Sequence, residues 1–254
     1  IVFEPGSFFT TDVAMIGALS DSERKDFAIK GLEDKRSYIE YIKSFPENTE
    51  VRHVLTYKGD KLPDNQVTGT LSVGMNQSFI LLPEKLMRPR LADNRVGYFG
   101  IRQIDYGLDE QKAAARRYIT RWKLEPKDVA AYRRGELVEP VKPIIYYIDP
   151  ATPEEWRPYL KQGVNDWQKA FEKAGFKNAI MAKDPPSKTE DPDWSPEDAR
   201  YSVIRYVATD IQNAMGPHVH DPRTGEILES DIIWYHNVMN LLRNWFFIQT
   251  AAVN

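Results

Sequence analysis

The chain has 254 residues, of which 42% are hydrophobic and 28% are charged, a composition typical of a folded globular protein. The 34 Lys and Arg residues and the 37 Asp and Glu residues leave a net charge of −3, which does not indicate nucleic acid as a partner, and no apolar run approaches the roughly 20 residues of a membrane span. Cysteine is absent, which excludes disulfides, a thiolate zinc site and a cysteine nucleophile.

The first part of the chain, residues 1–138, is predicted to form a β-rich accessory domain. Alternating apolar and polar residues predict strands at 37–45 and 50–59, and the sequence PENT between them predicts a hairpin turn. Further strands are expected at 67–84, 95–107 and 116–125. This part contains no close grouping of catalytic residue types, and His53, which lies in an alternating strand, is interpreted as structural.

From residue 139 to residue 254 the pattern changes to alternating strands and helices, so the whole chain is predicted to be an α+β protein. The clearest helix covers 153–174, with Thr152 and Glu155 as its capping box and Gly175 as its stop. Before it, a short helix and a proline-bearing linker are expected at 127–143, followed by a buried strand at 142–149. After it, strands are expected at 177–184, 198–209 and 226–235, and a buried helix at 236–254.

Three of the four histidines lie in the stretch GPHVHDPRTGEILESDIIWYHN, residues 216–237. A zinc site needs three or four ligands, which His218 and His220 would supply together with His236 or Asp221. However, His236 lies beyond a whole predicted strand, near the start of the final helix. We therefore interpret the histidines as lining a loop, and a local zinc site at His218 and His220 stays the alternative.

The strand in the same stretch is a candidate for substrate binding. Gly225 ends a turn of the Asp-Pro-x-x-Gly kind, and the residues after it alternate in part between apolar and polar. A strand of this type at a sheet edge can pair with an extended peptide, or it can be an ordinary edge strand protected by Glu229 and Asp231. The candidate residues are Gly225, Glu226, Ile227, Leu228, Glu229 and Ser230.

Several long segments, in order, resemble a bacterial family of zinc-dependent metallopeptidases, metzincin-like zincins of the periplasm or cell envelope. They are YITRWKLEPKD, GELVEPVKPIIYYIDPATPEEWRPYLKQGVNDWQKAFEKAGFKNAI, EDARYSVIRYV and GPHVHDPRTGEILESDIIWYHNVMNLLRNWFFIQTAAV. The likeness covers roughly residues 116–254, and residues 79–99 resemble the accessory domain that precedes the protease domain in that family.

The resemblance implies a mixed sheet, a long backing helix at 153–174 and an antiparallel edge strand at 225–234 that forms the upper rim of the cleft. In such proteases the zinc lies on a helix carrying HExxH, whose histidines bind the metal and whose Glu polarises the attacking water. HExxH does not occur in this sequence, which is where it departs from the family pattern.

The resemblance thus predicts the N-terminal portion of a zinc metalloendopeptidase, with residues 139–254 as the upper part of the protease domain. Its partners would be a peptide or protein substrate and the missing catalytic part, and its location the periplasm, the cell envelope or the exterior. We expect the fragment to be inactive, without catalytic residues or bound zinc, and to present an apolar surface to the missing part. The alternative is a non-catalytic peptide-binding or scaffold module, a degenerate zincin.

Overall fold

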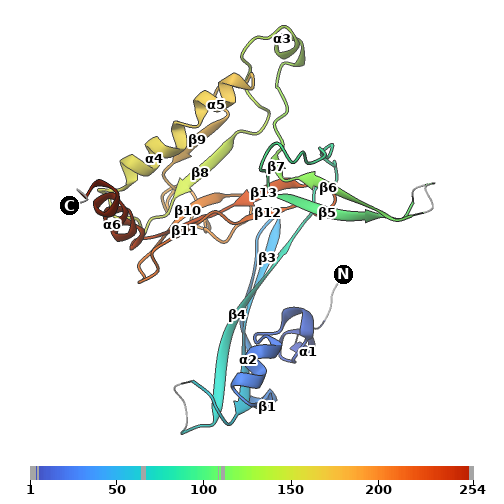
Figure 1. Ribbon diagram of the computed structural model, residues 1–254, viewed down its shortest axis with the longest axis vertical. Coiled ribbons are helices and arrows are strands. Elements are labelled where there is room, and N and C mark those ends of the chain that lie inside the picture. The colour runs from blue at the N-terminus through green and yellow to red at the C-terminus, as the bar shows by residue number, and fades with distance from the viewer. Residues whose placement is uncertain (1–3, 5, 64–66, 108, 110–111, 252–254) are drawn as a thin grey trace. The chain divides into compact units, whose positions relative to one another are not determined.

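The computed structural model of the protein describes residues 4, 6–63, 67–107, 109 and 112–251 (Figure 1). Helices and sheets are both present, which confirms the α+β class. The chain divides into two compact units, Ile1–Leu81 and Leu82–Asn254. The change of pattern at residue 138 does not coincide with this division, because Val138 lies inside the second unit and is bridged to Phe176 there.

The first unit is built on one long antiparallel ribbon. β3 (Asn48–Gly59) pairs with β4 (Thr70–Ile80) on one side, and with β2 (Tyr38–Ser44) and β1 (Ile29–Leu32) on the other. The predicted hairpin between β2 and β3 is confirmed, and the Phe45 amide donates to the Asn48 carbonyl across its turn (2.7 Å). The helical segments are α1 (Gly6–Phe9), η1 (Ala14–Ile16), α2 (Asp21–Asp26) and η2 (Asp34–Arg36).

The core of the first unit follows from the period of two along β3. Val51, His53, Leu55 and Tyr57 alternate along the strand, and all four side chains are buried. The ring of His53 meets that of Phe9 edge to face, with 5.5 Å between the ring centroids. Burial lowers the pKa of His53, which keeps the ring neutral near pH 7. This environment supports the structural role predicted for His53.

The second unit contains a five-stranded sheet in the order β11-β14-β10-β8-β9. Its strands are β8 (Ile144–Ile148), β9 (Ile180–Lys183), β10 (Ser202–Val207), β11 (Ala214–Met215) and β14 (Ile232–Tyr235). Neighbouring strands run parallel, except that β11 is antiparallel to β14. The strands predicted at 142–149, 177–184 and 198–209 are therefore confirmed as β8, β9 and β10, and the sheet is mixed.

The predicted helix at 153–174 is present but starts later and is broken into α4 (Arg157–Asn165) and α5 (Gln168–Lys173). The predicted capping box at Thr152 is wrong, because the hydroxyl of Thr152 is buried without a hydrogen-bond partner among the described residues. The reason is Pro158, which has no amide proton to donate and is tolerated only in the first turn, so the helix begins beside it.

The ends of these two helices are fixed by polar contacts to β9. The Asn165 side chain accepts a hydrogen bond from the Ala182 amide (3.1 Å), and the Gln168 side chain accepts from the Ala179 amide (2.9 Å). Because β9 is an edge strand, these side chains satisfy backbone amides that no further strand pairs with. Gly175, at φ +91°, follows α5 and is the predicted stop.

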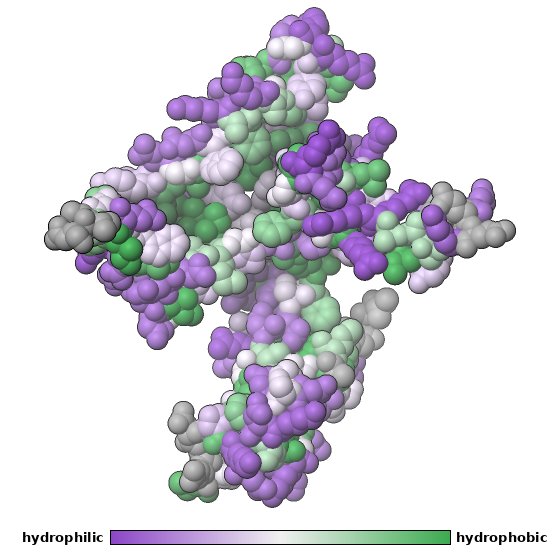
Figure 2. Space-filling model, viewed as in Figure 1, coloured by the Kyte–Doolittle hydropathy of each residue, from purple (hydrophilic) through white to green (hydrophobic). Residues whose placement is uncertain are grey.

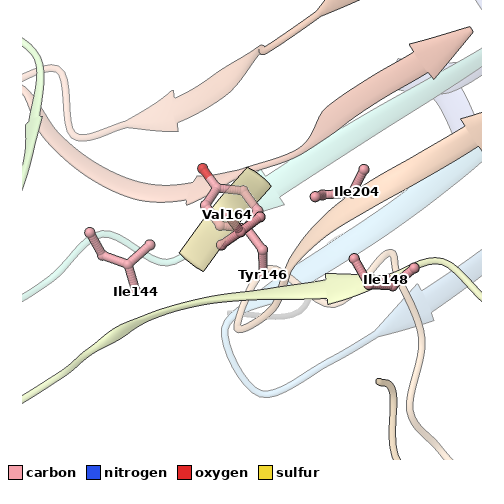
Figure 3. Close-up of a cluster of buried hydrophobic side chains, with 5 residues drawn as sticks. All are labelled: Ile144, Tyr146, Ile148, Val164 and Ile204. Carbon is pink, nitrogen blue, oxygen red and sulfur yellow. The ribbon is translucent and has the colours of Figure 1, made fainter. Parts of the chain in front are cut away.

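The main hydrophobic core lies between α4 and the sheet (Figure 3). It consists of Ile144, Tyr146 and Ile148 from β8, Val164 from α4 and Ile204 from β10. The three β8 residues alternate with half-buried ones, so the face of β8 toward α4 is the more deeply buried one.

A second, smaller cluster joins α3 (Val129–Arg133) to the loop after α5. The predicted short helix is confirmed, and Asp128 caps it by accepting from the Ala131 amide (2.9 Å). The remaining strands are β5 (Gly100–Asp105), β6 (Ala114–Ile119), β7 (Arg121–Trp122), β12 (His218–His220) and β13 (Glu226–Ser230).

The final helix, α6 (Val238–Thr250), differs from the prediction of a buried helix. None of its residues is buried, and Phe246 and Ile248 are 62% and 74% exposed. The apolar residues from Leu242 to Ile248 are therefore exposed, whereas Val238, Met239 and Leu241 at the start of α6 are half-buried. No helix in the described part of the chain has the length and apolar character needed to cross a membrane.

Candidate functional site

The predicted site residues lie on the hairpin formed by β12 and β13, whose turn is organised by Asp221. The carboxylate of Asp221 is buried and accepts from the Arg223 amide (2.8 Å) and from the Arg223 guanidinium (2.7 and 2.9 Å). The same guanidinium donates to the Pro83 carbonyl (2.8 Å). The Arg223 hydrogen bonds hold the pKa of Asp221 below its usual value. Asp221 is thus a paired structural anion rather than a free metal ligand.

Gly225 closes this turn for a steric reason. Its φ is +75°, and a Cβ placed there would lie 2.5 Å from the carbonyl oxygen of Ile119. The Gly225 carbonyl accepts from the Arg121 amide (2.9 Å), which joins the turn to β7. Only glycine fits this backbone and this close approach, so Gly225 has a structural role whatever the site does.

The other predicted substrate-binding residues, Glu226, Ile227, Leu228, Glu229 and Ser230, form β13. The prediction that they form an edge strand is wrong, because β13 lies between β12 and β7 in a three-stranded sheet. The Ser230 amide also donates to the Ser202 hydroxyl (3.1 Å), and the Ser230 hydroxyl donates to the Pro217 carbonyl (3.1 Å). Much of the β13 backbone is therefore already paired.

The stretch predicted as one strand at 226–235 is in fact two strands in two sheets, divided at Asp231. The Asp231 carboxylate accepts from the Val203 amide (2.8 Å), and burial raises its pKa. The guanidinium of Arg205 forms ion pairs with two carboxylates: its Nη1 lies 3.7 Å from Oδ2 of Asp231, and its Nε lies 3.3 Å from Oδ2 of Asp149. These contacts hold Asp231 at the point where the chain leaves β13 and enters β14. β14 is an interior strand of the five-stranded sheet, between β11 and β10.

The antiparallel edge strand of the five-stranded sheet is β11, Ala214–Met215. It pairs with β14 through Ala214 and Met215, and no other described strand pairs with its outer side. Met215 is 49% exposed. Through Gly216 and Pro217 the chain continues from β11 into β12. The edge expected at residues 225–230 thus lies 11 to 15 residues earlier in the chain, ahead of the β12–β13 hairpin and in the other sheet.

The two histidines of β12 lie on a strand rather than in a loop, which corrects the favoured interpretation. The ring centroids of His218 and His220 are 5.2 Å apart. The pKa of His218 is lowered, mainly by burial and to a smaller extent by the charge of His220. The Nδ1 atom of His220 is buried without a hydrogen-bond partner in the part of the chain that is described. The pair is therefore a close, partly desolvated set of imidazoles.

This pair does not fit a zinc site. Zinc needs at least three protein ligands, and Asp221, the nearest carboxylate in sequence, is already bound by Arg223. His236 follows β14 in the other sheet, and its Nδ1 lies 2.9 Å from the Tyr206 hydroxyl. Among the described residues there is no group of three or more potential ligands that could hold a metal ion.

An apolar groove with a volume of about 500 Å³ lies between α4 and the strands of the mixed sheet. Figure 2 shows the hydrophobic surface in this hollow. Ala214 of the edge strand borders the groove. Its other lining residues are Trp122, Ile144, Tyr146, Tyr159, Leu160, Gly163, Val164, Trp167, Phe171, Ile180, Ile204, Ile232 and Trp234. Sequence reasoning missed the groove because helix and strand residues far apart in the chain line it.

A smaller pocket, about 400 Å³, lies beside the β12–β13 hairpin. His218 and Ile227 line it from the hairpin, and Tyr98, Phe99 and Arg121 line it from preceding segments. Nearby in sequence, the Glu226 carboxylate is buried, one of its oxygens has no hydrogen-bond partner among the described residues, and burial raises its pKa. Of the residues in and near this pocket, sequence reasoning had identified His218, Glu226 and Ile227 but not Tyr98, Phe99 or Arg121.

Fold and site together define an α+β protein with a mixed sheet whose short antiparallel edge strand borders an apolar groove. Residues 1–127 match the model of a family described as a domain of unknown function, DUF5117. This match spans half of the 254 residues, and the chain belongs to that family. No curated protein and no solved structure matches the chain.

Proposed function

We propose that this chain is the N-terminal portion of a zinc-dependent metalloendopeptidase and that β11 supplies the rim that binds its peptide substrate. The single observation that carries the proposal is an antiparallel edge strand, β11, on an otherwise parallel sheet beside an apolar groove. The resemblance of residues 116–254 to metzincin-like zincins implies an edge strand of this kind. The proposed rim is therefore Ala214–Met215 in place of residues 225–230.

The physical basis for substrate binding at β11 is strand addition. An unpaired strand edge offers backbone amides and carbonyls in a row, and an extended peptide can pair with them while alternate side chains enter pockets. Ala214 is a small residue at the border of the groove, which leaves room for a substrate side chain. We assign this chain the binding and orientation of the peptide backbone.

The metal and the general base are assigned to residues outside this sequence, because HExxH does not occur in it and no described group of residues fits a zinc site. The groove and the exposed apolar residues of α6 are surfaces against which a catalytic helix would pack. Contiguous exposed apolar patches commonly mark interaction surfaces. A periplasmic, cell-envelope or secreted location is part of the proposal and rests on the resemblance alone.

The first test is the metal content and the chelator-sensitive peptidase activity of the natural protein that contains this chain. About one zinc per chain, together with peptide hydrolysis that is lost on chelation and restored by zinc, would support the proposal. A natural protein with neither property would refute catalysis and leave the non-catalytic peptide-binding alternative.

The second test locates the rim. Hydrogen exchange of the 254-residue chain is measured with and without an excess of an extended peptide. Successive amides of a strand point to opposite sides, so strand addition at β11 predicts slower exchange at one amide, that of Ala214, which donates to the Asn213 side chain in the free chain (2.8 Å). Little change is expected in β13, where backbone groups are already paired. Protection confined to β13 would contradict the assignment of the rim to β11.

A further inference from the structure

Two arginines lie directly opposite each other on the β5–β6 hairpin, whose strands lie side by side (Figure 1). In the register of this pair Arg102 is the partner of Arg117, so both side chains project from the same face. Both residues are exposed. Like charges directly opposite each other destabilise a strand pair, and a two-stranded sheet has little other stabilisation.

A third arginine extends this face. The Ile119 amide donates to the Arg90 carbonyl (3.0 Å), and the Ala92 amide donates to the Arg117 carbonyl (2.8 Å), so residues 90–92 run along the free side of β6. Arg90 is thus opposite Ile119, two residues along β6 from Arg117 and on the same face. Arg90 is exposed as well. We call Arg90, Arg102 and Arg117 the arginine face.

The opposite face of the hairpin is neutralised. There Arg116 lies opposite Gln103 and forms an ion pair with Asp105 (3.5 Å). The Gln103 side chain donates to the carbonyls of Pro222 (2.9 Å) and Arg223 (3.2 Å), which ties this face to the turn between β12 and β13. By contrast, the side chains of the arginine face have no hydrogen bond or ion pair with any described residue.

The imbalance of charge is local to this region. Residues 82–123 contain ten Lys and Arg against five Asp and Glu, although the whole chain has a net charge of −3. Gly100 contributes to the arrangement, because a Cβ at Gly100 would lie 3.2 Å from the Nε of Arg117, whose side chain therefore passes close to the glycine. Uncompensated positive charge is thus concentrated on the exposed face of a hairpin whose other face is tied to the β12–β13 turn.

We propose that the arginine face binds an acidic segment of a protein substrate, an inference that rests on the proposed function. Guanidinium groups pair with carboxylates through two parallel hydrogen bonds, a geometry that lysine does not reproduce. Alternate side chains of an extended peptide lie roughly 6.6 Å apart, which is close to the separations of about 5 to 8 Å between opposite and diagonal positions of a strand pair. An acidic residue at every second position therefore matches the three arginines.

The net negative charge of the chain argues against a long polyanion or an anionic membrane, which would be repelled outside this small face. A short acidic peptide needs contact only with the arginines themselves. Its binding is expected to weaken as salt increases, because the contacts are exposed to solvent.

The test uses a fluorescent decapeptide with Glu at alternate positions, titrated into the 254-residue chain and followed by anisotropy at low and at moderate salt. The same peptide with Gln in place of Glu is the ligand control. We expect the Glu peptide to bind, the Gln peptide not to bind, and the double variant R102Q/R117Q to weaken binding by about tenfold. R116Q is the matched control, which also removes an exposed arginine of this hairpin and is expected to change affinity by less than about twofold.

The double variant R102K/R117K keeps the charge but loses the planar fork, and an affinity between that of the original chain and that of R102Q/R117Q is expected. Equal binding of the Glu and Gln peptides, or equal weakening by R116Q and R102Q/R117Q, would overturn the proposal. Binding to vesicles of an anionic phospholipid without binding of the Glu peptide would also overturn it, and would identify a membrane surface instead. Because no hydrolysis is measured, failure here leaves the zinc and activity test of the proposed function unaffected.

Discussion

Replacing Gly225 with Ala is expected to destabilise the second unit through two separate terms. At φ +75° any residue with a Cβ loses about 1–2 kcal/mol relative to glycine. The added Cβ also lies 2.5 Å from the carbonyl oxygen of Ile119, a backbone atom that can move only with its strand, and such overpacking costs about 1–3 kcal/mol. The sum, about 2–5 kcal/mol, is a large part of the stability of a typical domain.

Gly135 provides a matched control within the same unit. Its φ is +84°, but a Cβ there would have no atom within 4 Å, so Gly135→Ala is expected to cost only the backbone term of about 1–2 kcal/mol. Urea denaturation followed by tryptophan fluorescence measures both variants, since all six tryptophans of the chain lie in the second unit. If Gly225→Ala is no more destabilising than Gly135→Ala, the steric argument is refuted.

Three further predictions concern burial and hydrogen bonding in the second unit. Burial raises the pKa of Glu226, so the folded state holds that proton more tightly than the unfolded chain, and stability falls as pH rises from the usual pKa through the raised one. Glu226→Gln is therefore expected to raise the free energy of unfolding by about 1 kcal/mol at neutral pH and to leave it unchanged below about pH 4. If the free energy of unfolding of the original chain and of the variant depends on pH in the same way, the reasoning is contradicted. Ile148 lies in the main core and is 1% exposed, so Ile148→Ala is expected to lower the free energy of unfolding by about 3 kcal/mol in the same urea assay. A decrease of less than about 1 kcal/mol would argue against tight packing there. Gln168→Ala is expected to speed amide exchange at Ala179, whose amide it binds, but not at Ala182, which Asn165 holds; equal acceleration at both would indicate general loosening of the helices.

Local structure was predictable wherever it depends on a residue and its near neighbours. The period of two along residues 50–59 identified β3, and the apolar run at 142–149 identified β8, because alternation and burial follow from strand geometry alone. Gly175 marked the end of α5, because the left-handed conformation there favours glycine. The α+β class followed from the succession of such elements.

Helix boundaries were less predictable, since two local signals competed. Thr152 and Glu155 fit a capping box, but Pro158 sets the start of α4 four residues later than expected. The break between α4 and α5 depends on Asn165 and Gln168 binding the β9 edge, contacts that join residues up to 17 positions apart.

What the sequence determined by itself is therefore the set of local elements and the turn positions that only glycine fits, Gly225 among them. The tertiary structure decided which strand lies at the edge of the mixed sheet. β11 has two residues and no alternating pattern, whereas the residues of β13 alternate in part in the sequence and yet lie inside a sheet. The physical reason is that the alternation of side chains reflects which face of a strand is buried. An edge strand is instead one whose backbone hydrogen-bonding groups lack a partner strand, and all residues except proline have the same backbone donor and acceptor.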